Sequence, residues 1–87
     1  MGFDWDDDNL DHIARHQVEP EEAEEALSDP DLIVTDAYNT PTEQRAAVVG
    51  ATEDGRILFV VYMVREARFR VVTARDANKS QKRAYRG

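Results

Sequence analysis

The stretch that most limits the possible folds runs from Gly55 to Asp76, because it contains two runs rich in Val, Ile, Phe and Tyr. The charged residues 65–68 separate these runs, and this pattern predicts a β-hairpin. Residues 57–64 are apolar at every position, which is typical of a central strand covered on both faces. We therefore expect the hairpin to be the scaffold of the domain.

The second strand of this hairpin, residues 69–75, has a mixed pattern. Strict alternation predicts one face made of Phe69, Val71 and Thr73 and an opposite face made of Arg70, Val72 and Ala74. Arg75 then leaves the sheet at the end of the strand, where side chains from several elements can converge. Arg75 is therefore the first candidate for a functional residue.

The length of 87 residues predicts a single domain covering residues 1–87. A domain of this size has a modest core, so we expect one layer of helix on one sheet. The absence of cysteine excludes disulfides, thiol nucleophiles and thiolate metal sites. The longest apolar run is too short to span a bilayer, and the acidic N-terminal segment does not resemble a signal peptide, so a cytoplasmic location is expected.

The net charge of −7 is distributed unevenly along the chain. Residues 1–31 contain twelve acids and one base, giving −11, whereas residues 75–87 contain five bases and one acid, giving +4. Residues 32–74 are neutral, with five of each. This asymmetry suggests a partner that recognises charge, although a solvated acidic helix pair and a basic tail would give the same pattern. Contact with RNA would have to be local, at the basic end.

The N-terminal third predicts a brief edge strand at Phe3-Asp4-Trp5, followed by two helices. Trp5, in the edge segment, is expected to pack in the core. Asp6-Asp7-Asp8-Asn9 offers a cap and favourable acids for the first helix, which should run to about His16. Its apolar stripe is Leu10, Ile13 and Ala14. Pro20 suits the first position of the second helix, whose buried stripe is Ala23, Ala26 and Leu27.

His12 and His16 are four residues apart, so they share one side of the first helix. The pair could hold zinc, but the glutamate of the HExxH motif is absent and a third ligand is needed, so a metal site is disfavoured. A structural role and a catalytic or phosphate-contacting role remain open, because histidine titrates near neutral pH.

The remaining elements complete an α+β fold. Residues 32–35 and 44–51 predict strands, a loop at residues 36–42 separates them, and Gly55 suits a hairpin turn. The expected architecture is two N-terminal helices and a C-terminal helix packed on a four-stranded, mainly antiparallel sheet. The C-terminal helix, residues 79–85, carries Lys79, Lys82 and Arg83, with Arg86 just beyond.

An ordered set of residues along the whole chain resembles the BrnT family. The set contains Asp4-Trp5-Asp6, Asn9, His12, His16, Val18, the acidic second helix, Arg45, Gly50, Gly55-Arg56, residues 70–75 (RVVTAR), Arg83 and Tyr85. Two positions depart from the pattern: Gln17 stands where relatives often have glycine, and Gln81 where they often have an acid.

This resemblance implies a toxin of a type II toxin–antitoxin system with a RelE-like ribonuclease fold. The implied activity is a metal-independent endoribonuclease, with no cofactor, that cleaves mRNA and inhibits translation. The implied partners are an RNA substrate and a BrnA-like antitoxin with a ribbon-helix-helix fold, through which the toxin reaches DNA only indirectly. No membrane partner is implied.

RNA cleavage through the 2′-hydroxyl needs a proton acceptor, a proton donor for the 5′ oxygen and positive charge on the phosphate. Guanidinium groups match phosphate oxygens well. On this basis the candidate catalytic residues are Arg45 and Arg75 as phosphate clamps, Arg83 as a third cation, Tyr85 for stacking or proton relay, and His12 or His16 as acid or base. Lys79, Lys82 and Arg86 are candidate RNA-binding residues. Each arginine could instead form a surface ion pair, and Tyr85 could instead pin the last helix to the sheet.

Two other classes of function remain open. One is a catalytically inactive, toxin-like module that binds an antitoxin and helps it to repress transcription. The other is a metal-dependent hydrolase built on His12, His16 and the aspartate cluster. The ribonuclease hypothesis makes a geometric prediction, namely that Arg45, Arg75 and Arg83 meet at one rim of a curved antiparallel sheet.

Overall fold

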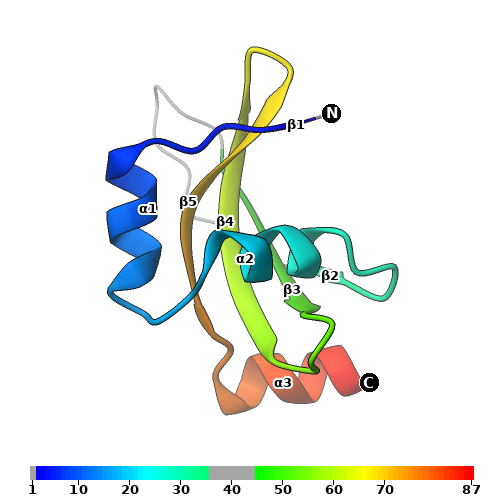
Figure 1. The fold of residues 1–87 in the computed structure, drawn as a ribbon. Helices are drawn as coiled ribbons and strands as arrows, with labels where there is room; N and C mark the ends of the chain where they lie inside the picture. The colour runs from blue at the N-terminus through cyan, green and yellow to red at the C-terminus, as the bar shows by residue number, and fades with distance from the viewer. Residues whose placement is uncertain (1, 36–44) are drawn as a thin grey trace.

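The predicted hairpin forms the middle of a five-stranded sheet in a computed structural model that describes residues 2–35 and 45–87 (Figure 1). The strand order is β1-β5-β4-β3-β2. The strands are β1 (Gly2–Phe3), β2 (Ile33–Thr35), β3 (Ala46–Ala51), β4 (Ile57–Arg65) and β5 (Arg68–Asp76). The three helices are α1 (Asp7–Ala14), α2 (Pro20–Leu27) and α3 (Lys79–Arg86). The α+β class and the positions of the three helices are as predicted.

The expectation of a four-stranded sheet is wrong, because the N-terminal segment adds a fifth strand. Gly2 and Phe3 of β1 run parallel to β5 and pair with Arg68 and Phe69, while all other pairs are antiparallel. The amide of Asp4 donates a further hydrogen bond to the carbonyl of Phe69 at 2.8 Å. The brief edge strand predicted at residues 3–5 is therefore present, but it is shorter and begins one residue earlier than expected. The predicted loop at residues 36–42 and the predicted strand start at residue 44 lie outside the described residues.

A β-bulge in β5 overturns the predicted alternation of this strand. Val61 pairs with Thr73 and Tyr62 with Val71, so Val72 is an extra residue in the ladder. As a result Val71 and Ala74 are both fully buried in the same core cluster, although alternation would put them on opposite faces. A bulge rotates the side chains that follow it by one position.

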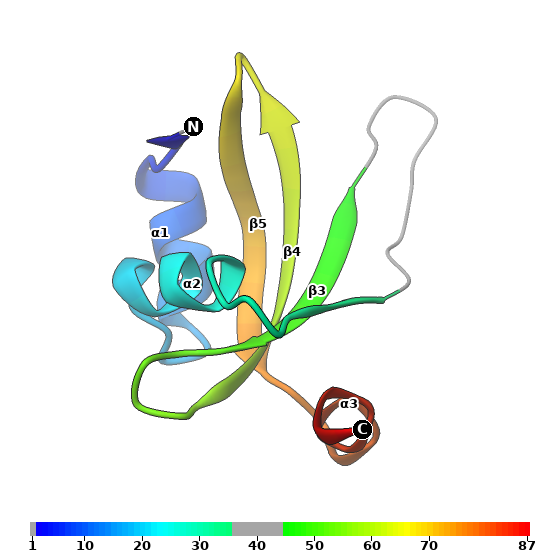
Figure 2. The ribbon, with the colours of Figure 1, turned by 90° about the vertical axis from the view of Figure 1, so that its right-hand side faces the viewer.

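The helices cover both faces of the sheet, so the expectation of a single helical layer is wrong (Figure 2). On the face of α1 and α2, which we call the helical face, Ile13, Ala23 and Ala26 join a core with sheet residues such as Leu58 and Val60. Tyr85 of α3 instead packs on the other face, against a cluster of Val49, Ile57 and Ala77. Helix α3 covers only the end of this second face near the start of β4, and we call this side the open face (Figure 2).

Local sequence explains how the helices begin and end. Asp6 and Asn78 cap α1 and α3 through side-chain hydrogen bonds, and Pro20 occupies the first turn of α2 as predicted. Helix α1 ends at Ala14, two residues before the predicted end. Trp5 is half-buried and packs against the main core. Among residues 2–35 and 45–87, none of the helices has the length and apolar composition that crossing a membrane requires.

Candidate functional site

A row of residues on β4, on β5 and immediately before β3 forms the floor of a hollow at the edge of the open face. Met63 pairs with Arg70, and Arg45 immediately precedes Ala46, whose partner on β4 is Tyr62. One further step of this register places Arg45 beside Met63. Arg45, Met63 and Arg70 together line a hollow of about 240 Å³, with Val71 and Val72 beside them. The sheet therefore brings two arginines to one cavity, one within β5 and one immediately before β3.

Helix α1 supplies the opposite wall of this hollow through Asp8, Asn9 and His12. His12 and His16 are both exposed, and their ring centroids are 5.9 Å apart. His16 lies beyond the end of α1, but the chain continues in a turn that keeps the two rings adjacent. The hollow thus combines an imidazole with two guanidinium groups, and a second imidazole lies next to the first.

Arg70 is held in place by the acidic residues that precede α1. Its guanidinium lies 2.9 Å from Oδ2 of Asp6 and 3.6 Å from Oδ2 of Asp4. The bond from Arg70 is the main reason that the pKa of Asp6 is below its usual value, and the same bond raises the pKa of Arg70. Both groups are therefore charged at neutral pH, and Asp6 fixes Arg70 against the wall of the hollow.

Asn9 attaches α1 to the edge of β5 at the level of the hollow. Its buried side-chain amide donates to the carbonyls of Asp4, at 2.9 Å, and Val71, at 3.1 Å, and accepts from the amide of Asp6 at 2.8 Å. The carbonyl of Val71 lies next to the bulge, where the pairing of β5 with β1 has ended. Asn9 therefore satisfies the strand edge and fixes the position of His12 one turn later.

Arg75 shares the open face with Arg70 because of the bulge. The two arginines are five residues apart, so a regular strand would point them to opposite faces. Their partners on β4, Phe59 and Met63, are four residues apart and therefore on one face. Arg75 stacks on the ring of Phe59, with the guanidinium carbon 4.6 Å from the ring centroid. Phe59, beside Arg75, and Met63, beside Arg45, are four residues apart on β4. Arg75 and Arg45 are therefore separated by about 13 Å along the strand direction.

The remaining predicted residues lie on α3. Lys79, Arg83 and Arg86 are exposed, and Lys82 is half-buried, near enough to Asp76 to help lower the pKa of that carboxyl after Arg56, the main cause. Tyr85 points inward and donates a hydrogen bond to Asp29. The structure therefore brings His12 and Arg45 together, and sets Arg75 and the cations of α3 apart from them. Among the hollows formed by residues 2–35 and 45–87 that the structure describes, none is lined by Arg45, Arg75 and Arg83 together.

Sequence reasoning did not single out Arg70 as a site residue. Alternation placed it on the face opposite Thr73, and nothing in the local sequence marks Val72 as a bulge. Arg56 is a second such residue, with a structural role. It binds Glu22 at 3.1 Å, Asp76 at 2.8 Å and the carbonyl of Gln17 at 2.8 Å, and so ties the connection between α1 and α2 to the sheet.

In the described ranges, the carboxylates around His12 and His16 do not complete a metal-binding group with them. Within the parts of the chain that the structure describes, no three His, Cys, Asp or Glu side chains are arranged to hold a metal ion. The arrangement suits binding and acid–base chemistry on an anion, because two cations and the imidazole of His12 line the same hollow.

Comparison with known proteins identifies the family. Residues 5–81 match the family model described as ribonuclease toxin, BrnT, of type II toxin-antitoxin system. A search of curated proteins finds no match. The matched range includes the residues of the hollow, Arg75 and the bulge in β5, and it covers nearly the whole chain. The chain therefore belongs to the BrnT family of ribonuclease toxins of type II toxin–antitoxin systems.

Proposed function

We propose that this toxin is a metal-independent endoribonuclease that cleaves mRNA in the hollow between α1 and the open face of a RelE-like sheet. The observation that carries the proposal is that His12 and Arg45, from segments far apart in the chain, line one small cavity together with Arg70. Phosphodiester transfer by the 2′-hydroxyl requires positive charge on the phosphate together with groups that accept and donate protons, and imidazole is a common choice for the latter.

In this mechanism His12 accepts the proton of the 2′-hydroxyl. The 2′ oxygen attacks the adjacent phosphorus, the bond to the 5′ oxygen breaks, and the products are a 2′,3′-cyclic phosphate and a 5′-hydroxyl. His16 in its protonated form donates the proton that the leaving 5′ oxygen takes up. It is the candidate for this role because its ring lies beside that of His12, with the two centroids 5.9 Å apart. Arg45 binds the phosphate as negative charge develops on it. Arg70, fixed by Asp6, adds positive charge to the same cavity.

The rest of the RNA would lie along the open face toward α3. Arg75, stacked on Phe59, is about 13 Å along the sheet from the row of Arg45. Arg83 and the RNA-binding candidates Lys79, Lys82 and Arg86 then continue the positive charge on α3. Single-stranded RNA suits such a surface, because charged side chains follow its backbone without reading its sequence. Tyr85 has a structural role in this proposal, since its hydroxyl is bound to Asp29.

The antitoxin that type II membership implies would be a BrnA-like protein with a ribbon-helix-helix fold. It would neutralise the toxin and carry it to DNA only indirectly. The competing proposal is an inactive, toxin-like module that only binds this antitoxin and co-represses transcription.

The experiment compares His12→Ala, Arg45→Ala and the control Arg15→Ala. Arg15 is exposed at the end of α1 and is not among the residues of the hollow. Purified proteins are incubated with single-stranded RNA in the presence of EDTA, and growth is followed after expression. We expect each hollow variant to lower cleavage by about 100-fold or more, because acid–base and electrostatic contributions are of this size. The control should cleave normally.

Two results would contradict the proposal. If both hollow variants cleave RNA like the wild type, the active site lies elsewhere. If the wild type neither cleaves RNA nor arrests growth but still binds its antitoxin, the inactive module is the correct description.

A further inference from the structure

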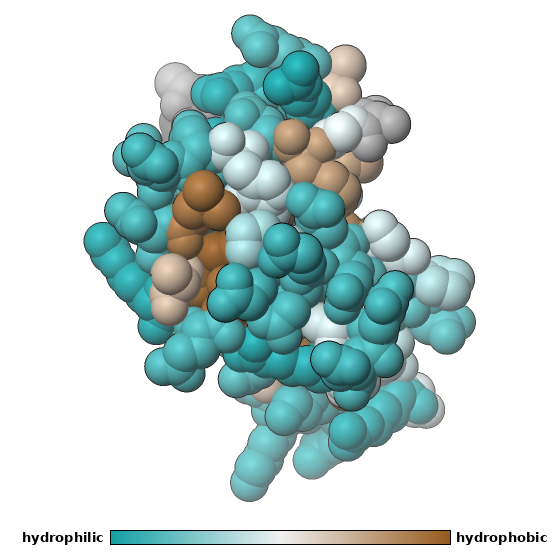
Figure 3. All heavy atoms as spheres, viewed as in Figure 1, coloured by the Kyte–Doolittle hydropathy of each residue, from teal (hydrophilic) through white to brown (hydrophobic). Residues whose placement is uncertain are grey.

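The helical face has an apolar area that the helices leave uncovered near the tip of the β4–β5 hairpin. Phe69 contacts Phe3 and Tyr62, with ring centroids 5.7 and 5.5 Å away. Val64, the cross-strand partner of Phe69, is 56% exposed. Figure 3 shows hydrophobic surface above the polar side chains that cover α2, on the side of the hairpin tip. Phe3, Tyr62 and Phe69 are half-buried, and partly exposed apolar side chains that lie together are typical of an interaction surface.

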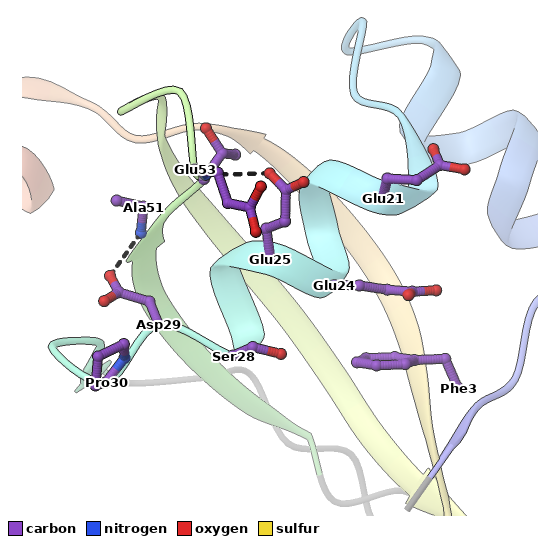
Figure 4. A pocket seen from close by; sticks show the side chains of 10 residues that line it. Phe3, Glu21, Glu24, Glu25, Ser28, Asp29, Pro30, Ala51 and Glu53 are labelled. Atoms are coloured by element: carbon purple, nitrogen blue, oxygen red, sulfur yellow. Dashed lines mark hydrogen bonds between the residues drawn. The ribbon is translucent and has the colours of Figure 1, made fainter.

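A groove continues from this apolar area along α2 (Figure 4). It has a volume of about 630 Å³ and contains Phe3 at one end and Pro30 and Ala51 at the other. Five of the ten described residues that line it are acidic, and none is basic; the acids are Glu21, Glu24, Glu25, Asp29 and Glu53. The groove therefore combines apolar residues at its two ends with negatively charged side chains along its length.

Several of these acids are already oriented by hydrogen bonds. Oε2 of Glu24 accepts from the indole of Trp5 at 2.8 Å, and Oε1 of Glu25 accepts from the amide of Glu53 at 3.1 Å. Oδ2 of Asp29 accepts from the amide of Ala51 at 2.8 Å. These bonds come from neutral donors, so they hold the carboxylates in position without neutralising them. Fixed charges of this kind lower the entropic cost of binding a partner.

The groove is on the opposite side of the sheet from the proposed path of RNA. Helix α2 covers the helical face, whereas α3 and Arg75 belong to the open face (Figure 2). An RNA phosphate would be repelled by the acidic walls, but a cationic protein segment would be attracted. Charge complementarity therefore selects a basic partner for this groove.

We propose that this groove is a docking site for a basic amphipathic segment of the antitoxin protein. Apolar side chains of that segment would cover Phe3 and the aromatic cluster, and Lys or Arg side chains would face Glu21, Glu24 and Glu53. A helix laid in a groove is a common way to combine such contacts. The inference rests on membership of a toxin–antitoxin family and deepens the proposed function. It does not depend on RNA cleavage.

The test uses a double variant and a control with the same change of charge. Glu21→Lys/Glu53→Lys reverses two exposed acids of the groove, and Asp11→Lys/Glu66→Lys reverses two exposed acids that do not line it. The first probe is a synthetic amphipathic helical peptide with Lys on one side and Leu on the other, matched to a peptide with Glu in place of Lys. The second probe is the cognate antitoxin. Trp5, bound to Glu24, is the only tryptophan, so its fluorescence reports occupation of the groove.

We expect the wild type and the control variant to bind the Lys peptide and the antitoxin, and the Trp5 emission to shift on binding. The groove variant should bind both about tenfold or more weakly, and added salt should weaken binding by the wild type. The thermal unfolding and the RNA cleavage of the groove variant should match those of the wild type. Failure of RNA cleavage in every protein would overturn the ribonuclease proposal and leave the docking proposal standing.

Three results would overturn the docking proposal. The first is equal loss of antitoxin binding in the groove variant and in the control, which would indicate a general effect of charge. The second is unchanged antitoxin binding by the groove variant. The third is sedimentation of the toxin alone as a dimer that the groove variant abolishes, because a second copy of this chain, through its basic α3, would then be the occupant.

Discussion

The hydroxyl of Tyr85 donates a hydrogen bond to Oδ2 of Asp29 at 2.5 Å and so connects the last helix to the loop that follows α2. The same oxygen accepts the amide of Ala51 at 2.8 Å, so one carboxylate joins α3, β3 and the end of α2. The bond to Asp29 raises the pKa of Tyr85 to about 12. Burial raises the pKa of Asp29, but the hydrogen bonds from Tyr85 and from backbone amides outweigh it and leave this pKa below its usual value.

The variant Tyr85→Phe separates this structural role from catalysis. Phenylalanine keeps the packing of the ring against the cluster of Val49, Ile57 and Ala77 but removes the hydrogen bond to a charged group. We expect the free energy of unfolding to fall by about 2 kcal/mol, measured by urea denaturation at pH 7. RNA cleavage at a temperature where the variant is folded should equal that of the wild type. A folded variant without activity would instead indicate that the hydroxyl takes part in the reaction.

Gly50 allows α2 to pack directly on β3. A methyl group at this position would lie 2.3 Å from the carbonyl oxygen of Ala26, which is backbone and cannot move independently of the helix. We expect Gly50→Ala to lower the free energy of unfolding by about 1–3 kcal/mol, as overpacked cores do. Gly2→Ala is the matched control, since a methyl group there would contact nothing within 4 Å. Thermal denaturation followed by circular dichroism measures both, and equal stabilities would show that α2 can shift to accept the extra atom.

Gln17 ends the first helix with a backbone conformation that glycine adopts more easily. Its φ is +58°, and the amides of Gln17 and Val18 donate to the carbonyls of Ala14 and Ile13 at 3.0 and 3.1 Å. This pattern is the Schellman motif, in which glycine avoids the steric cost of the left-handed region. We expect Gln17→Gly to raise the free energy of unfolding by about 1 kcal/mol. Gln17→Ala, which keeps the steric cost, should give no such gain in the same urea titration.

Arg56 should make stability depend on pH in the acidic range. The hydrogen bond from Arg56 is the main reason that the pKa of Asp76 is lowered, and Arg56 contributes to the lowered pKa of Glu22 after the backbone amide of Glu19. A carboxylate with a lowered pKa stabilises the fold above its unfolded pKa, near 4. This contribution is lost as the pH falls through the folded value.

The variant Arg56→Met should therefore be less stable than the wild type by about 1–3 kcal/mol at pH 7, because several hydrogen bonds to charged and backbone groups are removed. The difference should shrink as the pH is lowered below about 4. Urea denaturation at a series of pH values measures it. Arg15→Met serves as the control for removal of a positive charge at an exposed position. If the stability difference between the wild type and Arg56→Met does not change with pH, Asp76 and Glu22 are not its cause.

Much of the architecture could be predicted from local patterns. The apolar runs around residues 57–64 and 69–75 identified the hairpin, and Pro20, Asp6 and Asn78 marked helix starts, because capping and strand propensity act over a few residues. The set of residues from Trp5 to Tyr85 indicated the BrnT family, and the family match agrees with it. The candidate site was predicted only as a list of residue types suited to phosphate chemistry.

The sequence by itself determined the class of fold, the approximate positions of most helices and strands, the uneven charge and the family. Only the tertiary structure decided that Val72 forms a bulge, that Arg70 and Arg75 consequently share a face, and that His12 meets Arg45 in one cavity. The physical reason is that strand register depends on contacts between residues distant in the chain. A shift of one residue in that register reverses the face of every side chain that follows.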